Sequence, residues 1–135
     1  MKESHCMSKK FHLAISVIDI EQSVEEYNER LGQPADVVAP GEYALWRTKE
    51  LNFSIRKTAP GEGGRLRHLG WEDSEAKFFT CDKDCNGILW EEFSASQQAA
   101  EIKSAWPETD YKPGKNKDRK SKKNKQDEPP QEPVS

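Results

Sequence analysis

Two histidines and two neighbouring carboxylates are the side chains of this sequence best suited to chemistry. His12 lies in an apolar run near the N-terminus, and His68 follows Arg67 in a second run. Glu91 and Glu92 lie together in a third run. Successive side chains of a strand face opposite sides of a sheet, so only one of the two glutamates can point inward. Each of these residues also has an ordinary structural reading, because histidines on apolar strands are often partly buried and glutamates often exposed.

A second candidate for chemistry is the acidic turn between the last two predicted strands. Asp82, Asp84 and Asn86 match positions one, three and five of an EF-hand calcium loop, and a glycine follows at the turn. Position twelve should carry a bidentate glutamate, but it is Phe93, and Glu92 comes one residue early. A polar turn that joins two strands explains the same residues.

The cysteines predict free thiols. Cys6, Cys81 and Cys85 are odd in number, and Cys81 and Cys85 lack a cysteine or histidine partner at zinc spacing. The first residues include no apolar run typical of a secretory signal. We therefore expect reduced thiols and a cytoplasmic protein.

The elements that must position these residues form an α+β pattern. Asp19 and Gly32 fit the two caps of a helix with one apolar stripe. Ser94 and Gln97 form a capping box for a final helix that ends before Pro107. Alternating or apolar segments predict strands at residues 11–18, 36–39, 42–48, 51–57, 65–71, 78–81 and 87–93.

Composition predicts a flexible leader over residues 1–10, a domain over 11–107 and a disordered charged tail over 108–135. Residues 1–111 hold 20 acidic and 13 basic side chains, whereas residues 112–125 hold eight basic and one acidic. The acidic domain offers no nucleic-acid face, which leaves the basic tail as the one segment suited to nucleic acid. No apolar run reaches the roughly 20 residues of a membrane helix.

The N-terminal half resembles the vicinal oxygen chelate superfamily, which includes glyoxalases, bleomycin-resistance proteins and extradiol dioxygenases. The resemblance rests on Phe11 to Ile20, on the helix with Tyr27, on Leu31-Gly32 and on Arg67 to Trp71. It implies a βαβββ module of the glyoxalase-like type. In that superfamily two modules surround a divalent metal, the first strand of each offers a histidine, and the last strand of the second offers a glutamate.

Carried over to this chain, the resemblance implies His12 and His68 as metal ligands, with Glu91 or Glu92 as the carboxylate. Glu92 is slightly favoured, since Leu89 and Phe93 then share the other face. Two histidines and one carboxylate suit Fe, Mn, Ni or Zn and leave open positions for a bidentate substrate.

The second module is shorter than the resemblance requires. Only Asp73 to Ala76 separates the strand of His68 from the next strand, which leaves no room for a crossover helix. Either the module is truncated or the C-terminal helix replaces the missing one. An unprotected sheet edge would remain, so we expect a homodimer in which sheets from two chains meet.

Three functions follow as hypotheses. The first is a divalent-metal lyase, isomerase or dioxygenase that acts on a small molecule. The second is a non-catalytic module that binds a small molecule on the same fold, with Trp46, Trp71 and Trp90 as stacking walls or as core. The third is an EF-hand-like calcium-binding protein.

Overall fold

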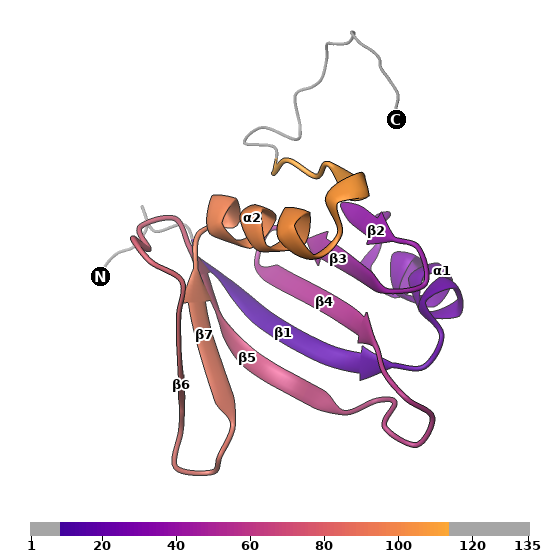
Figure 1. Cartoon of the computed structure of the whole chain (residues 1–135), viewed down its shortest axis with the longest axis horizontal. Coiled ribbons are helices and arrows are strands. Elements are labelled where there is room, and N and C mark those ends of the chain that lie inside the picture. The colour runs from indigo at the N-terminus through magenta and orange to yellow at the C-terminus, as the bar shows by residue number, and fades with distance from the viewer. Residues whose placement is uncertain (1–8, 114–135) are drawn as a thin grey trace, which may run out of the picture.

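The N-terminal strand is the centre of the fold. β1 (Lys9–Val17) pairs in parallel with β4 (Leu51–Lys57) and antiparallel with β5 (Leu66–Asp73). The computed structural model describes residues 9–113, which form one mixed sheet with strand order β2-β3-β4-β1-β5-β7-β6 and two α-helices (Figure 1). The α+β class is as expected. Most of the expected leader and tail, including Cys6, lies outside the described residues.

The other elements follow the predicted order closely. They are α1 (Ile20–Leu31), β2 (Val37–Ala39), β3 (Tyr43–Arg47), β6 (Thr80–Lys83), β7 (Leu89–Phe93), α2 (Ala95–Ala105) and a short 3-10 turn, η2 (Pro107–Thr109). Both predicted caps of α1 are present, because Asp19 accepts from the Gln22 amide at 3.0 Å and Gly32 has a φ of 76°. The capping box of Ser94 and Gln97 begins α2.

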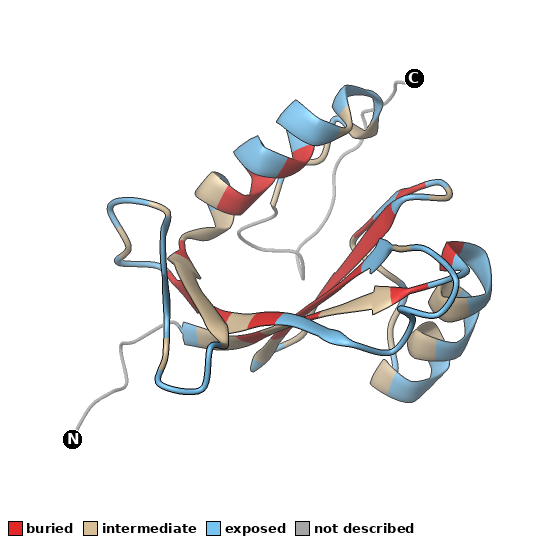
Figure 2. Ribbon diagram, turned by 60° about the horizontal axis from the view of Figure 1, so that its bottom comes forward, coloured by how far each residue is buried: buried red, intermediate tan, exposed pale blue. Residues whose placement is uncertain are grey.

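The two helices lie on opposite sides of a curved sheet (Figure 2). α1 packs against the convex side, where its Ile20 is buried and the rest of its apolar stripe is half-buried. α2 runs across the concave side. Each side has its own core cluster. Under α1 it comprises Val17, Ile20, Ala44, Trp46, Phe53 and Ile55, and under α2 it comprises Val37, Ala39, Tyr43, Leu45 and Ile102.

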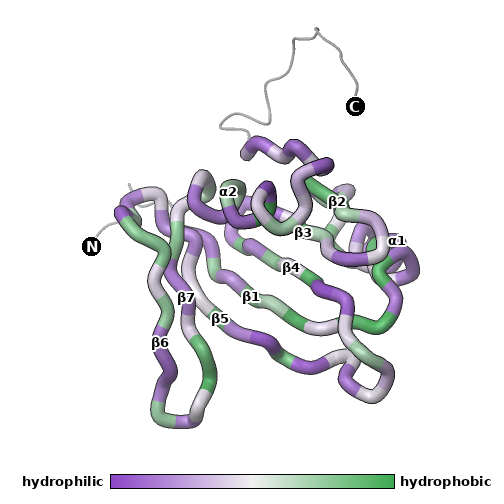
Figure 3. Tube along the Cα trace, viewed as in Figure 1, coloured by the Kyte–Doolittle hydropathy of each residue, from purple (hydrophilic) through white to green (hydrophobic). Residues whose placement is uncertain are grey.

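Strand alternation divides the residues between these two sides. On β1 and β4, Leu13 and Phe53 contact the core under α1, whereas His12 and Asn52 face α2. α2 therefore covers the side opposite to α1 and does not replace a crossover helix. α1 packs against β3 and β4 and does not cover the convex side of β5 and β7. Figure 3 shows a hydrophobic segment at the hairpin end of β7.

The ordered chain continues beyond the boundary expected at residue 107. Tyr111, which the sequence assigns to the tail, packs with Trp106 against the cluster under α2. Within the described residues, neither helix has the length and apolar character needed to cross a membrane.

Candidate metal centre

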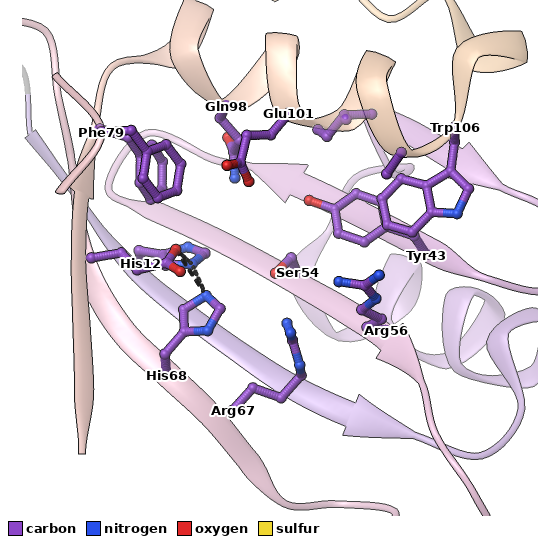
Figure 4. Close-up of a pocket in the computed structure, with 14 residues that line it drawn as sticks. His12, Tyr43, Ser54, Arg56, Arg67, His68, Phe79, Gln98, Glu101 and Trp106 are labelled. Carbon is purple, nitrogen blue, oxygen red and sulfur yellow. Dashed lines mark hydrogen bonds and ion pairs between the residues drawn. The ribbon is translucent and has the colours of Figure 1, made fainter. Parts of the chain in front are cut away.

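Three neighbouring strands bring His12, His68 and Glu91 together, and Figure 4 shows the two histidines beneath α2. The Nε2 atoms of the two histidines are 3.0 Å apart. The Glu91 carboxylate lies 3.1 Å from Nε2 of His68 and 3.9 Å from Nε2 of His12. Both histidines are buried, and the side chain of Glu91 is 17% exposed. A single chain thus supplies all three groups, without a contribution from a second copy.

These separations fit three ligands of one metal ion. Donor atoms bound at about 2.0–2.2 Å to a shared ion can be no more than about 4.4 Å apart. All three separations fall below that limit. Within residues 9–113, this is the one group of three histidine, cysteine or acidic side chains that lie close enough to share an ion.

Backbone register fixes the orientation of His12. The parallel pairing of β1 with β4 places His12 beside Asn52, and Nδ1 of His12 lies 3.1 Å from the Asn52 carbonyl and 2.9 Å from its Oδ1. Both partners are acceptors, so Nδ1 must carry the proton and donate it. The lone pair of the ring is therefore on Nε2, the atom that faces His68 and Glu91.

A buried polar chain holds Asn52 in turn. Its amide nitrogen donates to Glu72 at 2.8 Å and to Gln98 of α2 at 2.9 Å. Glu72 accepts two hydrogen bonds from Arg47, at 2.9 and 2.8 Å. A carboxylate only accepts, so Glu72 requires the amide nitrogen of Asn52 to face it. This arrangement turns Oδ1 towards His12 and supports the same tautomer.

Burial governs the charge of His12. It lowers the pKa of the imidazole, and the nearby His68 lowers it further, against smaller opposing effects from Asn52 and Glu91. His12 is therefore neutral near pH 7, as a metal ligand must be. For Glu72, burial alone would raise the pKa, but the hydrogen bonds from Arg47 and Asn52 bring it below its usual value.

The preference for Glu92 over Glu91 is wrong. Glu91 pairs with Gly70 and faces the histidines, so Glu92 points to the convex side. That preference requires Leu89 and Phe93 to point away from the site. Phe93 in fact shares the face of Glu91 and contacts the ring of His12, with centroids 4.9 Å apart. The concave side beneath α2 therefore holds both the candidate metal ligands and buried apolar side chains such as Phe93.

The EF-hand-like segment is a hairpin turn. One Asp84 oxygen accepts from the amides of Asn86 and Ile88, at 2.8 and 2.9 Å, and the other accepts from the Trp90 indole at 2.8 Å. These bonds close the turn between β6 and β7. Cys81 and Cys85 are exposed free thiols near this turn and take no part in the site.

A pocket of about 180 Å³ opens beside the three ligands. Tyr43 and Trp106 form one wall, stacked with ring centroids 4.5 Å apart, and Phe79 and Phe93 form another, 5.2 Å apart. Of the two alternatives for Trp46, Trp71 and Trp90, stacking walls or core, the first is excluded because none of them lines the pocket. Trp46 is buried in the core under α1, while Phe11 on the convex side contacts both Trp71 and Trp90.

Four other pocket residues are not among the site candidates that the sequence predicts. Arg56 and Arg67 line the pocket although each lies in an ordinary strand segment, and Gln98 and Glu101 reach it from α2. The alternation of β4 would have placed Arg56 on the face of Asn52. Nothing comparable predicts the position of α2 above that face.

Comparison with protein-family models gave no match, and comparison with curated proteins gave none. Among solved structures, the chain is similar to an NAD-dependent benzaldehyde dehydrogenase from Legionella pneumophila. The sequence identity is 11% and the TM-score is 0.44, over 62% of this chain and 97% of that chain. At that TM-score, function has to be argued from the residues of the chain itself.

Proposed function

We propose that this chain is a glyoxalase-like protein of the vicinal oxygen chelate type. In this proposal His12, His68 and Glu91 hold a divalent metal, and the pocket beside them takes a small molecule. The observation that carries the proposal is the convergence of three suitable donor atoms from β1, β5 and β7. The resemblance of residues 11–32 and 67–71 to that superfamily supports it independently.

The donor set narrows the choice of metal. Two neutral imidazoles and one carboxylate suit Fe, Mn, Ni or Zn better than calcium or magnesium, which prefer oxygen ligands. Three protein ligands leave coordination positions free for substrate oxygens. When bound, such an ion would polarise a substrate oxygen and stabilise the charge that develops there, as lyases, isomerases and dioxygenases of this type require.

The residues of the chain prepare the site in three ways. Asn52 holds His12 in the tautomer that exposes Nε2. Glu91 adds a negative charge that attracts a cation to two otherwise neutral ligands. α2 lies over the concave side, where His12 and His68 are buried, and burial strengthens the charge interactions at these donor atoms.

A metal titration tests the proposal. Full-length protein freed of metal with a chelator is titrated with Zn²⁺, Ni²⁺, Mn²⁺ and Fe²⁺ by calorimetry, the Fe²⁺ series under anaerobic conditions. We expect one ion per chain and a loss of affinity of more than about 100-fold in His12→Ala and His68→Ala, since removing a ligand costs more than disturbing its support. Glu91→Gln should also weaken binding.

Glu92→Gln is the matched control, because it makes the same change one residue away on the opposite side of the sheet. It should bind metal as the unaltered protein does. Equal effects of Glu91→Gln and Glu92→Gln, or no binding at micromolar metal, would contradict the proposal.

The wall of Tyr43 and Trp106 favours a second candidate, a module that binds a small molecule without converting it. Stacked aromatic rings beside a small pocket suit a planar ligand whether or not chemistry follows. Recovery of a ligand unchanged after incubation with the metal-loaded protein would favour this candidate over the enzyme.

We place the protein in the cytoplasm. Cys81 and Cys85 are exposed free thiols, and such thiols persist best in a reducing compartment. Cell fractionation with an antibody to the chain would test this location.

A further inference from the structure

A β-bulge turns Arg67 into the pocket beside His68. On β1, the consecutive residues Ala14 and Ile15 pair with His68 and Leu66, so Arg67 is the extra residue of β5. Regular alternation would send Arg67 and His68 to opposite sides of the sheet. Both instead line the same pocket, and bulges of this kind commonly re-aim a side chain next to a functional site.

Arg56 reaches the same pocket from β4 (Figure 4). Its guanidinium lies over the Trp106 ring, 5.1 Å from the ring centroid, which fixes its direction. Arg67 is an exposed residue, yet desolvation and the positive charge of Arg56 both lower its pKa, as expected for two cations that face one space.

Neither arginine has an acidic partner at ion-pair distance among residues 9–113. The other arginines of the sheet and its loops do: Arg47 pairs with Glu72 at 2.8 Å, and Arg65 pairs with Glu62 at 3.3 Å. Glu91 and Glu101 also line the pocket, so its fixed charges cancel before any ion binds. A divalent ion held by the proposed ligands would leave the pocket with a net positive charge.

We propose that Arg56 and Arg67 form a seat for an anionic group, a carboxylate or a phosphate, of the small molecule that enters this pocket. The inference rests on the proposed function only in one respect: the other end of the molecule would bind the metal through its oxygens. The pocket volume corresponds to roughly six water molecules at about 30 Å³ each. A pocket of this size suits a small acid or phosphate ester that carries a second oxygen function.

Calorimetry with inorganic phosphate and with malonate tests the seat on the full chain after chelator treatment. Working without metal separates the two proposals, because the arginines should bind an anion whether or not the histidines bind an ion. We expect the unaltered protein to bind at least one of the two probes. Arg67→Gln and Arg56→Gln should each raise its Kd about tenfold or more, as loss of a charge-assisted hydrogen bond predicts.

Arg65→Gln is the matched control, since it removes the same charge two residues away and outside the pocket. Its Kd should stay within about twofold of the unaltered protein. A preference for malonate assigns the seat to carboxylates and a preference for phosphate assigns it to phosphate esters, and either result supports the seat. Equal losses in Arg65→Gln and Arg67→Gln, or no binding of either probe at millimolar concentration, would overturn it.

Thermal stability distinguishes an anion seat from a structural role of Arg67. Two facing cations repel, so Arg67→Gln in buffer without phosphate should melt at the same temperature as the unaltered protein or slightly higher. Phosphate should raise the melting temperatures of the unaltered protein and of Arg65→Gln, and should raise that of Arg67→Gln much less. A clear drop in the melting temperature of Arg67→Gln would show that the side chain holds the sheet together and would overturn the inference.

Discussion

At the residue scale, Asn52 sets the orientation of His12, whereas the other two proposed ligands, His68 and Glu91, do not. Asn52 is fully buried, and its side chain and carbonyl both accept from Nδ1 of His12. Residues that orient a histidine ligand in this way typically contribute 10–100-fold to metal affinity. Asn52 thus belongs to the site although it would never touch the ion.

Replacing Asn52 tests this role. Asn52→Ala should lower Zn²⁺ affinity about 10–100-fold while all three ligands remain, because His12 loses one partner that fixes its tautomer. Ser54→Ala is the control, since Ser54 lies two residues further along β4 and also lines the pocket. Calorimetry measures both variants. An Asn52→Ala protein that binds Zn²⁺ as tightly as Ser54→Ala would rule out the orienting role.

The Arg47–Glu72 pair predicts a pH dependence of stability. Its side chains are 10% and 8% exposed, and the pKa of Glu72 is below its usual value. A carboxylate with a lowered pKa in the folded state stabilises the fold above its unfolded pKa of about 4.3. That contribution is lost as the pH falls through the folded pKa. Acid should therefore weaken the metal-free protein partly through Glu72.

In Glu72→Gln, Arg47 loses its buried partner, and we expect a loss of about 3–5 kcal/mol in the free energy of unfolding at pH 7. The difference from the unaltered protein should shrink once the pH is below the unfolded pKa of about 4.3, because Glu72 becomes protonated as the pH falls through its lower folded pKa. Urea unfolding of the metal-free proteins at pH 7, 5 and 3 measures both effects. A difference that stays constant down to pH 3 would show that ionised Glu72 does not stabilise the fold.

The sequence predicted part of this site, and strand periodicity explains why it could not predict the rest. The interval between His12 and His68 suits one module, and both histidines do converge. Strand periodicity supported only a slight preference for Glu92 over Glu91, which was wrong, because both sides of β7 carry an aromatic residue. Arg67 was out of reach, since a bulge adds one residue to β5 without a mark in the local sequence.

At the scale of elements, Gly70 allows β5 and β7 to approach each other. The two strands are parallel, and Gly70 pairs with Glu91. A Cβ atom on Gly70 would overlap the carbonyl oxygen of Glu91, which belongs to the backbone and cannot rotate away. The position of the Glu91 carboxylate therefore depends on Gly70, because any residue with a side chain at that position would push β7 away.

Gly70→Ala should push β7 away from β5. We expect a loss of about 1–3 kcal/mol in unfolding free energy, as for other overpacked sites, and weaker metal binding because Glu91 moves. Gly63→Ala is the control. Its Cβ would come within 2.8 Å of Cγ1 and 3.0 Å of Cδ1 of Ile18, whose side chain can shift because the residue is 48% exposed. Wild-type metal affinity in Gly70→Ala would show that β7 tolerates the shift.

Helix ends were predictable from the sequence, but the arrangement of the elements was not. Asp19, Gly32 and Ser94 mark their helix termini through local hydrogen bonds or backbone conformation, which depend on neighbours a few residues away. The packing of α2 on the concave side instead depends on Ile102 meeting Tyr43 and Leu45 from distant strands. No local pattern contains that information.

At the scale of the whole molecule, the convex side of β5 and β7 carries aromatic residues that neither helix of residues 9–113 covers. Phe11 contacts Trp71 and Trp90, with ring centroids 5.2 and 6.3 Å apart, and Trp71 is 38% exposed. β6 forms one edge of the sheet, and all its residues are exposed. We propose that a second copy of the chain covers this surface.

Sedimentation velocity tests the homodimer. The full chain should sediment as a dimer at micromolar concentration, and Trp71→Glu should dissociate it by placing a charge in the apolar contact. Gln22→Glu adds the same charge on exposed α1 and should leave the dimer intact. A monomer at high micromolar concentration would contradict the proposal, and so would a Trp71→Glu protein that remains dimeric.

The central position of β1 also bears on the order in which the chain folds. His12 contacts Asn52, 40 residues along the chain, and His68, 56 residues along. Contacts of such sequence separation form slowly, because each closes a long loop before it gains stability. β1 must wait for β7, the last strand among the described residues, before the three proposed ligands can meet. Metal uptake would then report completed folding, because the ion would link β1 to β7, the strands that lie furthest apart along the chain.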